Sequence, residues 1–151
     1  MKLKTLFCAA LILALSLAGC SAPAGDNTPP AGWTAIDLSA GRDAAAFAGM
    51  APESIPVSVI RQGETMDFLF EGVSLDALLT ALNLTVFSKI ELSVSDREEP
   101  MDITDWAKAA AGVFLAWNES GNPESPIRVF PKDAATGNLL IRNVTALLVT
   151  P

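Results

Sequence analysis

Phe70-Glu71-Gly72-Val73-Ser74-Leu75-Asp76-Ala77-Leu78-Leu79 is the stretch in which the spacing of apolar residues changes from that of a strand to that of a helix. The segment from Met66 to Phe70 is predicted to form a strand, and Gly72 is predicted to end it. Ser74 can cap a helix, because its side chain can accept a backbone N–H of the first turn. The apolar residues that follow have the i, i+3, i+4, i+7 spacing of one helix face: Leu75, Leu78, Leu79 and Leu82.

Upstream of this stretch the sequence predicts a hairpin, a lead-in and a tether. Pro56 to Ile60 is predicted to be a strand, joined by a turn at Gln62-Gly63-Glu64 to the strand that precedes Gly72. In the lead-in, residues 33–51, a strand could begin at Trp33, and Asp43 to Met50 could form one or two helical turns. Ser21 to Gly32 is rich in Pro, Gly and small polar residues, which is typical of a flexible tether.

Downstream of the same stretch, the pattern predicts mostly strands. Val86 to Val94 alternates between apolar and polar residues, which predicts a half-buried strand with Val86 on its apolar face. Thr104 to Ala111 is predicted to be a short helix that Gly112 ends, and Val113 to Trp117 a buried strand. Asn118 to Pro126 is predicted to be a loop, because it contains Asn, Gly and two prolines. Three more strands follow: Ile127 to Phe130, Leu139 to Ile141 and Val144 to Val149. The sum is an α+β fold, mostly β, with two short helices.

The first twenty residues have the pattern of a bacterial lipoprotein signal. Lys2 and Lys4 precede an apolar segment, Leu6 to Leu17, which is short for a membrane span. The sequence Leu17-Ala18-Gly19-Cys20 then places small residues before a cysteine, as a lipobox requires. Residues 1–19 are therefore predicted to be removed, and Cys20 to carry the lipid, with acyl chains such as palmitate. The alternative is an ordinary secretory signal cut near Gly19.

The predicted mature chain is strongly acidic. Loss of Lys2 and Lys4 leaves eight basic residues against 17 acidic ones, a formal charge of −9. Such a surface repels nucleic acid and anionic lipid alike. Membrane attachment is therefore expected to come from acyl chains, which would hold the domain on the extracytoplasmic side of the cell membrane. An envelope protein is a further possible partner.

The residue types that are missing limit the chemistry of the mature domain. The sequence contains no histidine and no tyrosine, and its two cysteines are Cys8, in the signal, and Cys20. A Ser-His-Asp or Cys-His system, a His or Cys zinc site and a thiolate-bound transition metal are therefore excluded. This argues against a redox enzyme. Carboxylate chemistry stays open, including a glycosidase-like carboxylate pair, whose separation in space a sequence does not give.

Acidic and aromatic residues offer two further candidate sites, a calcium loop and a ligand groove. The run of Asp96, Glu98, Glu99, Asp102 and Asp105 lacks the oxygen spacing and central glycine of a calcium loop. It is predicted to be a solvated loop that leads into a helix. Three tryptophans could line a groove; Trp106 and Trp117 are expected to pack, and Trp33 to be the exposed one.

Several segments resemble, in order, the oxidoreductase molybdopterin-binding domain of the sulfite oxidase type. They are Phe70 to Leu79, Ile90 to Asp96, Val113 to Asn118, Pro126 to Pro131 and Leu140 to Val149. The resemblance covers roughly residues 52–149 and implies that family's fold over residues 52–151, with a mixed sheet. It also implies a phosphorylated pterin as the family's ligand, and a cysteine that binds molybdenum.

The resemblance implies only a partial site in this chain. Arg128 matches the family's arginine that contacts the pterin or its phosphate, and a guanidinium suits that role. Lys132 and Arg142 are the nearby cations that could substitute for the family's downstream lysines. The metal-binding cysteine has no counterpart, so no cofactor is expected and molybdopterin stays possible by resemblance alone. The alternative for Arg128 is a strand arginine that packs or pairs with a surface carboxylate.

Three functions follow from these observations. The first is a non-catalytic lipoprotein whose degenerate molybdopterin-binding-like domain acts as a binding or docking module. The second is a pterin or small-anion binding protein that uses Arg128 with Lys132 or Arg142. The third is an accessory subunit of an exported molybdenum-dependent oxidoreductase system.

Overall fold

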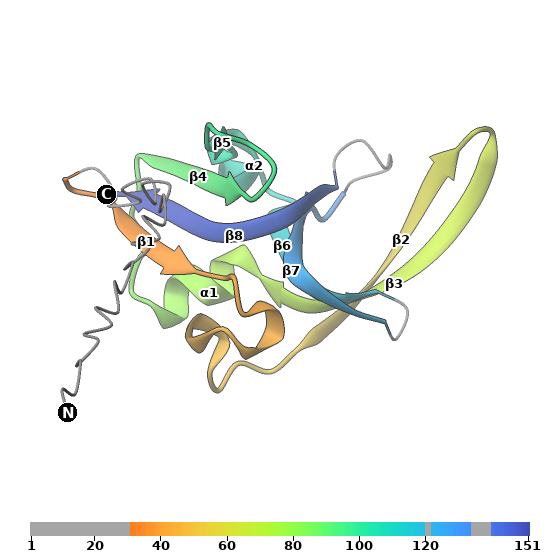
Figure 1. The fold of residues 1–151 in the computed structure, drawn as a ribbon, viewed down its shortest axis with the longest axis horizontal. Coiled ribbons are helices and arrows are strands. Elements are labelled where there is room, and N and C mark those ends of the chain that lie inside the picture. The colour runs from red at the N-terminus through yellow and green to blue at the C-terminus, as the bar shows by residue number, and fades with distance from the viewer. Residues whose placement is uncertain (1–30, 120–121, 134–139) are drawn as a thin grey trace, which may run out of the picture.

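The computed structural model describes residues 31–119, 122–133 and 140–151, and its strands form one antiparallel sheet (Figure 1). The strands are β1 (Thr34–Asp37), β2 (Glu53–Arg61), β3 (Glu64–Ser74), β4 (Lys89–Val94), β5 (Met101–Asp102), β6 (Val113–Glu119), β7 (Asn122–Pro131) and β8 (Ile141–Thr150). The helices are α1 (Leu75–Ala81) and α2 (Thr104–Lys108), with 3-10 turns η1 (Gly41–Asp43) and η2 (Ala45–Phe47). The fold is therefore α+β and mostly β, as the sequence predicts.

The strand order is β2-β3-β6-β7-β8-β4-β5, and β1 joins the sheet at β8. Val144 of β8 pairs with both β4 and β7, and Leu147 pairs with both β4 and β1. Because a strand has two edges, β7 and β1 share the edge of β8 that is opposite β4. Every pairing between described strands is antiparallel, so the mixed sheet expected from the resemblance is wrong. Parallel neighbours need long crossover connections, whereas β2 and β3 are joined by a two-residue turn.

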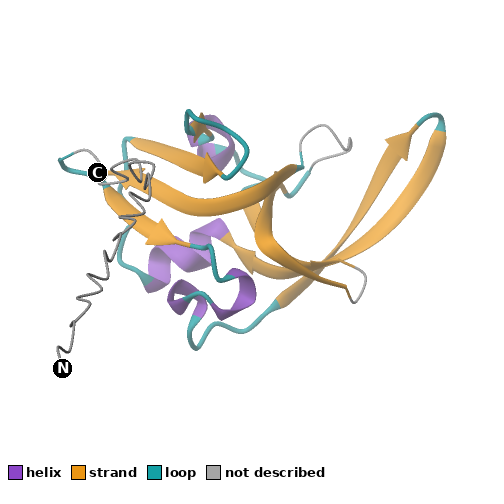
Figure 2. Cartoon of the chain, viewed as in Figure 1, coloured by secondary structure: helices purple, strands orange, loops and turns teal. Residues whose placement is uncertain are grey.

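Helix α1 forms where the stretch 70–79 predicts it. The Ser74 side chain accepts the Ala77 N–H at 3.2 Å, and Leu75, Leu78 and Leu79 are buried. Asn83 follows with a φ of 56°, a left-handed conformation that asparagine tolerates after a helix. Figure 2 shows α1 with the two 3-10 turns on one side of the strands, and α2 beside β4 and β5. Within the part of the chain that the structure describes, neither helix has the length and apolar composition of a membrane span.

Two hydrophobic clusters lie on opposite faces of the central strands. Along β6, Val113, Leu115 and Trp117 belong to the main core, which α1, β1, β4 and β8 also line. The residues between them, Phe114 and Ala116, belong to a second group, because successive side chains of a strand point to opposite faces. This group, here called the aromatic cluster, consists of Val57, Phe70, Phe114, Ala116 and Phe130.

The β2–β3 hairpin is the most extended feature of the molecule. Its turn residues Gln62 and Gly63 both have positive φ, 54° and 84°, which suits the twist of a two-residue hairpin. Strand β3 pairs with β6 only from Phe70 onward, so residues 55–69 form a two-stranded projection. We call this projection the arm and the remaining described residues the body. Figure 1 shows the arm's turn at the opposite end of the molecule from β1 and the C-terminus.

The sequence predicts that Gly72 ends its strand, and this prediction is wrong. Gly72 lies inside β3, which continues to Ser74. The register between β3 and β6 shifts at Glu71/Gly72. A Cβ at Gly72 would lie 1.9 Å from the backbone oxygen of Leu115. The glycine is therefore required for the close approach of β3 to β6, at the point where the arm joins the body.

Three other predictions are also corrected. Asn118–Pro126 is not a loop, because β6 continues to Glu119 and β7 begins at Asn122. The segment's two prolines, Pro123 and Pro126, are tolerated because β8 pairs with β7 only from Ile127 onward. Before Ile127, the β8 side of β7 has no backbone ladder that a proline could interrupt. Val86 precedes β4 and is 84 % exposed instead of buried. Helix α2 ends at Lys108 instead of Ala111.

Candidate functional site

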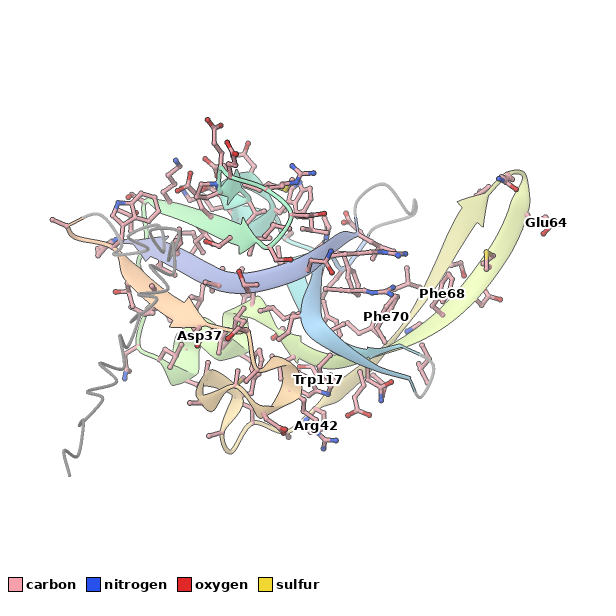
Figure 3. All side chains as sticks on the ribbon, in the orientation of Figure 1. Asp37, Arg42, Glu64, Phe68, Phe70 and Trp117 are labelled. Carbon is pink, nitrogen blue, oxygen red and sulfur yellow. The ribbon has the colours of Figure 1, made fainter. Side chains whose placement is uncertain are left out.

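The arm has one apolar face, which its register defines. Val57 pairs with Phe68 and Ile55 pairs with Phe70, and directly paired residues share a face. Met66, two residues before Phe68, lies on the same face. Figure 3 shows Phe68 and Phe70 on the side of the hairpin that faces β7. We call Ile55, Val57, Met66 and Phe68 the arm face; it is continuous with the aromatic cluster.

Along β3, burial on this face decreases from the base of the arm to its tip, whereas on β2 Val57 is buried and Ile55 is half-buried. Phe70 is fully buried, Phe68 is half-buried, and Met66 is 40 % exposed. The ring of Phe70 lies 5.0 Å from that of Phe130 and 6.0 Å from that of Phe68. The base of the arm is thus packed, whereas its outer part has no second layer among the described residues.

The opposite face of the arm is more polar. Ser58 donates a hydrogen bond to Asp67 across the hairpin at 2.6 Å. Ile60 and Leu69 are also exposed on this side, but a polar pair separates them. The continuous apolar surface is therefore on the side that faces β7.

The outer edge of β2 is protected by Pro56. The residues next to a two-residue turn, Arg61 and Glu64, form a hydrogen-bonded pair, and such pairs alternate along an antiparallel ladder. By this alternation Ser54, Pro56, Ser58 and Ile60 point their backbone groups away from β3. Since proline has no N–H, the edge lacks a donor at its centre, which opposes the addition of another strand. The arm is therefore better suited to contact through its face than through its edge.

Two of the predicted cations lie at the base of the arm. Arg128 is 7 % exposed, and its guanidinium carbon lies 5.7 Å from the centre of the Phe70 ring. The ammonium nitrogen of Lys132 lies 5.9 Å from the Phe114 ring and 3.7 Å from Oε2 of Glu53. Both side chains therefore cover the aromatic cluster, and cations over ring faces are attracted electrostatically. For Arg128, packing within the domain is the role that this geometry supports.

Arg142 lies on the neighbouring strand, next to Arg128 in the register. Ile127 pairs with Val144 and Val129 pairs with Ile141, so two residues of β8, Arg142 and Asn143, lie opposite the single Arg128. Asn143 has a φ of 60° at this bulge. Arg142 is exposed. The structure thus brings the three predicted cations to one face, with Arg142 the most accessible.

The described residues do not fit a molybdenum centre. Ranges 31–119, 122–133 and 140–151 contain no cysteine or histidine, and no group of three or more carboxylates there could hold a metal ion. A phosphorylated pterin needs accessible cations, but Arg128 is buried against Phe70 and Lys132 is paired with Glu53. Only Arg142 would be ready to meet a phosphate without rearrangement. Cys20, the predicted lipidation site, lies outside the described residues.

The acidic run borders a separate hollow of about 750 Å³ between β1, β4 and β8. Its lining includes Asp37, Arg97, Glu98 and Glu99. Asp37 accepts the Ser39 N–H at 2.9 Å, and hydrogen bonds from Ser39, by its side chain and then its backbone, lower the pKa of Asp37. Within the run itself, Asp96, Glu98 and Glu99 are exposed in turns and bends, which agrees with the sequence interpretation of a solvated loop.

The arm face was not among the predicted sites, although the sequence contains a signal for it. The signal was the period-two row Met66-x-Phe68-x-Phe70, placed beside Ile55 and Val57 by the Gln62-Gly63 turn. Trp117 is buried as expected and donates to Glu71 at 3.1 Å. Trp33 is half-buried instead of exposed, with the Lys89 ammonium 5.6 Å from its ring.

No protein-family model and no curated protein matches the sequence.

Proposed function

We propose that this protein is an exported lipoprotein, lipidated at Cys20, whose domain is a non-catalytic docking module for another protein of the cell envelope. The domain would lie on the extracytoplasmic side of the cell membrane. The observation that carries the proposal is the arm face, an apolar surface on a projecting hairpin that is packed at its base and uncovered toward its tip.

An uncovered apolar face on a projecting hairpin needs an explanation. Monomeric proteins rarely expose contiguous apolar surface without a use for it, and two-stranded ribbons are marginally stable by themselves. Along the arm, Met66 and Phe68 keep part of their apolar surface in water. A partner that covers them would remove this surface from water and would stabilise the arm at the same time.

The charge around the base of the arm indicates the chemistry of the partner. Arg142 is exposed next to Arg128 in the strand register, in a chain whose predicted mature charge is strongly negative. A complementary protein surface would have an apolar centre, to meet Met66 and Phe68, and acidic residues at its rim.

We infer from the ordered motifs that the domain is a divergent relative of the sulfite oxidase-type molybdopterin-binding domain. The support is the order of the five resembling segments along the sequence. In this form of the proposal the partner would be the catalytic subunit of an exported molybdenum-dependent oxidoreductase. Co-purification of such an enzyme with the anchored protein tests it.

A second candidate function, the binding of a pterin or small anion, is favoured by the bulge that places Arg142 next to Arg128. The test is expression of the full chain with an active molybdenum-cofactor pathway, followed by assay of the purified protein for pterin fluorescence and molybdenum. Arg142→Ala should remove the signal, and Arg97→Ala, an exposed arginine of the 95–100 loop, should keep it. Absence of both signals from the wild-type protein rejects this candidate.

Docking through the arm face is tested by site-specific photo-cross-linking in cells. A benzophenone amino acid at Met66 should give one defined adduct, which Phe68→Asp should abolish. The matched control is the benzophenone at Thr65, the neighbouring exposed residue on the opposite face. Tryptophan emission can confirm folding, because Trp33, Trp106 and Trp117 all lie outside the arm. No adduct at Met66, or equal adducts at both positions, would reject docking through this face.

The anchor is tested independently of the partner. Fatty-acid labelling should mark the wild-type protein, and Cys20→Ser should lose the label and leave the membrane fraction. Cys8→Ser is the matched control and should keep the label. A Cys20→Ser protein that retains the label would reject lipidation at this residue.

A further inference from the structure

The end of the molecule opposite the arm also carries exposed apolar and basic side chains. Trp33 lies just before β1, whose first residue Thr34 pairs with Val149 near the end of β8. Lys89, the first residue of β4, pairs with Thr150. The segment between α1 and β4 therefore reaches the same end as the start of β1, as Figure 1 shows. We call Trp33, Val86, Phe87, Lys89 and Lys108 the proximal surface.

The apolar residues of this surface include the most exposed of the large hydrophobic residues described above. Val86 is 84 % exposed, and Phe87 is half-buried. Ser88 follows them and is held in place, because its N–H donates to the Thr150 carbonyl at 2.8 Å. Val86 and Phe87 are thus presented from a fixed position at the end of the sheet.

Lysines accompany both aromatic rings of the proximal surface. The Lys89 ammonium lies 5.6 Å from the Trp33 ring, and the Lys108 ammonium lies 5.8 Å from the Phe87 ring. Lys108 also donates to the Ser88 carbonyl at 3.4 Å. Aromatic rings next to lysines are typical of side chains at a membrane interface, where the ring meets the acyl boundary and the ammonium meets phosphate.

We propose that the proximal surface rests on the headgroup region of the membrane that anchors the protein, an inference that depends on the lipid anchor proposed above. The occupant of this surface is thus the lipid bilayer. Only twelve residues, Ser21 to Gly32, separate Cys20 from Trp33. The sequence predicts a flexible tether here, and a flexible chain of that length spans roughly 20 Å, so the anchor would keep Trp33 near the membrane at high effective concentration. Weak contacts that could not bind a free domain to lipid are then sufficient.

The contact is expected to depend on apolar insertion more than on charge. Lys89 is paired with Glu91 and lies 3.9 Å from Asp102, so its charge is largely compensated. Asp105 is exposed nearby on α2. The proximal surface therefore has no large positive excess, and its contact with lipid should not require anionic headgroups.

In this orientation the two ends of the molecule have different environments. The proximal surface contacts lipid, and the arm, at the opposite end in Figure 1, points away from the membrane. An arm face directed away from the bilayer is accessible to a protein partner in the envelope.

The test uses the full lipidated chain in phosphatidylcholine vesicles, with and without brominated acyl chains, which quench tryptophan only at short range. Brominated lipid should quench the wild-type emission, and Trp33→Phe should remove most of the quenched fraction. Trp117→Phe, at a tryptophan that is only 4 % exposed in the main core, should leave most of it. The inference is rejected if brominated lipid quenches the emission of Trp33→Phe as strongly as that of the wild type. It is also rejected if the wild-type emission is not quenched.

Val86→Asp gives a second and independent reading, since a substitution at so exposed a residue should leave the fold intact. It should reduce quenching several-fold, and Met66→Asp on the arm, the matched control, should not change it. Equal quenching in both variants rejects the inference. Mass spectrometry of the same samples separates the two proposals. A lipidated Cys20 without quenching rejects only the membrane contact, whereas an unmodified Cys20 rejects the anchor and the contact together.

Discussion

The body and the arm share one strand, β3, but they are stabilised in different ways. In the body, β6 is buried on both faces, by the main core on one side and by the aromatic cluster on the other. In the arm, the same β3 has one neighbour, β2, and no layer over its outer part. Stability and exposed apolar surface are therefore separated within a single strand, with Phe70 at the boundary.

The magnitudes of burial support this separation. A fully buried large apolar side chain contributes about 1.5–3 kcal/mol relative to an exposed one. The body contains many such residues, whereas along β3 of the arm no side chain before Phe70 is fully buried. Substitutions in the body should therefore change the free energy of unfolding, and substitutions toward the tip of the arm should change binding.

The largest effect is expected where the two regions meet. Gly72→Ala would place a Cβ 1.9 Å from the Leu115 backbone oxygen, which no side-chain movement can relieve. We expect a loss of more than about 4 kcal/mol in the free energy of unfolding, measured by urea denaturation. Gly49→Ala is the control, because a Cβ there meets no atom within 4 Å and only the positive φ adds a cost, about 1 kcal/mol. Similar losses in the two variants would show that the close approach of β3 to β6 is not needed.

Truncation of two phenylalanines compares the base of the arm with its middle. Phe130→Ala removes a fully buried ring that packs against Phe70 and Phe114, and should cost about 3–4 kcal/mol. Phe68→Ala removes a half-buried ring and should cost about 1 kcal/mol. Urea denaturation of both variants checks the difference. Equal costs would mean that the arm is as much a part of the core as the body.

A polar substitution on the outer arm face should leave stability nearly unchanged. Met66→Ser changes a side chain that is 40 % exposed near the tip of the arm, and the expected change is within about 0.5 kcal/mol. Partner cross-linking from a benzophenone placed at Phe68, on the arm face, should nevertheless decrease. A large loss of stability in Met66→Ser would contradict the separation of the two regions.

The smallest effect concerns the acid stability of the body. Hydrogen bonds from Ser39 and Thr104, by side chain and then backbone, lower the pKa values of Asp37 and Asp102 below 3.8. The stability that these carboxylates contribute is present above pH 3.8 and is lost as the pH falls through their lower folded-state pKa values. The double variant Asp37→Asn, Asp102→Asn should therefore show a shallower loss of stability in acid. Urea denaturation across this range checks it, and a slope equal to that of the wild type would contradict it.

The sequence predicts local structure well in this protein and contacts between distant segments poorly. Ser74 and the leucines of α1 lie within one short segment, so capping and spacing are enough to identify the helix. The prolines of β7 wrongly predict a loop, because they lie where β8 does not pair with β7. This pairing begins only at Ile127. A one-dimensional pattern does not contain that pairing.

The candidate site shows the same limit. Arg128, Lys132 and Arg142 are recognised as cations, but their placement depends on Phe70, Phe114 and a bulge in β8. The arm face was missed because its two halves become one surface only through the register of β2 with β3. Residue types predict chemistry here, and strand pairing decides which of those residues are accessible.

In the lipid-anchored state proposed above, Pro56 has a consequence for how many copies of the protein can occupy one membrane. Lipid-anchored molecules diffuse in two dimensions and share one orientation, so their terminal strands collide far more often than those of proteins in solution. A nine-residue strand with every outward amide available would template the stacking of copy upon copy into fibres. With Pro56 at its centre, β2 offers a second copy no unbroken row of donors, and the charge of Asp67 opposes the same stacking along the arm's other edge. At high density on a membrane, the anchored molecules of this proposal can therefore stay separate and keep their arms available.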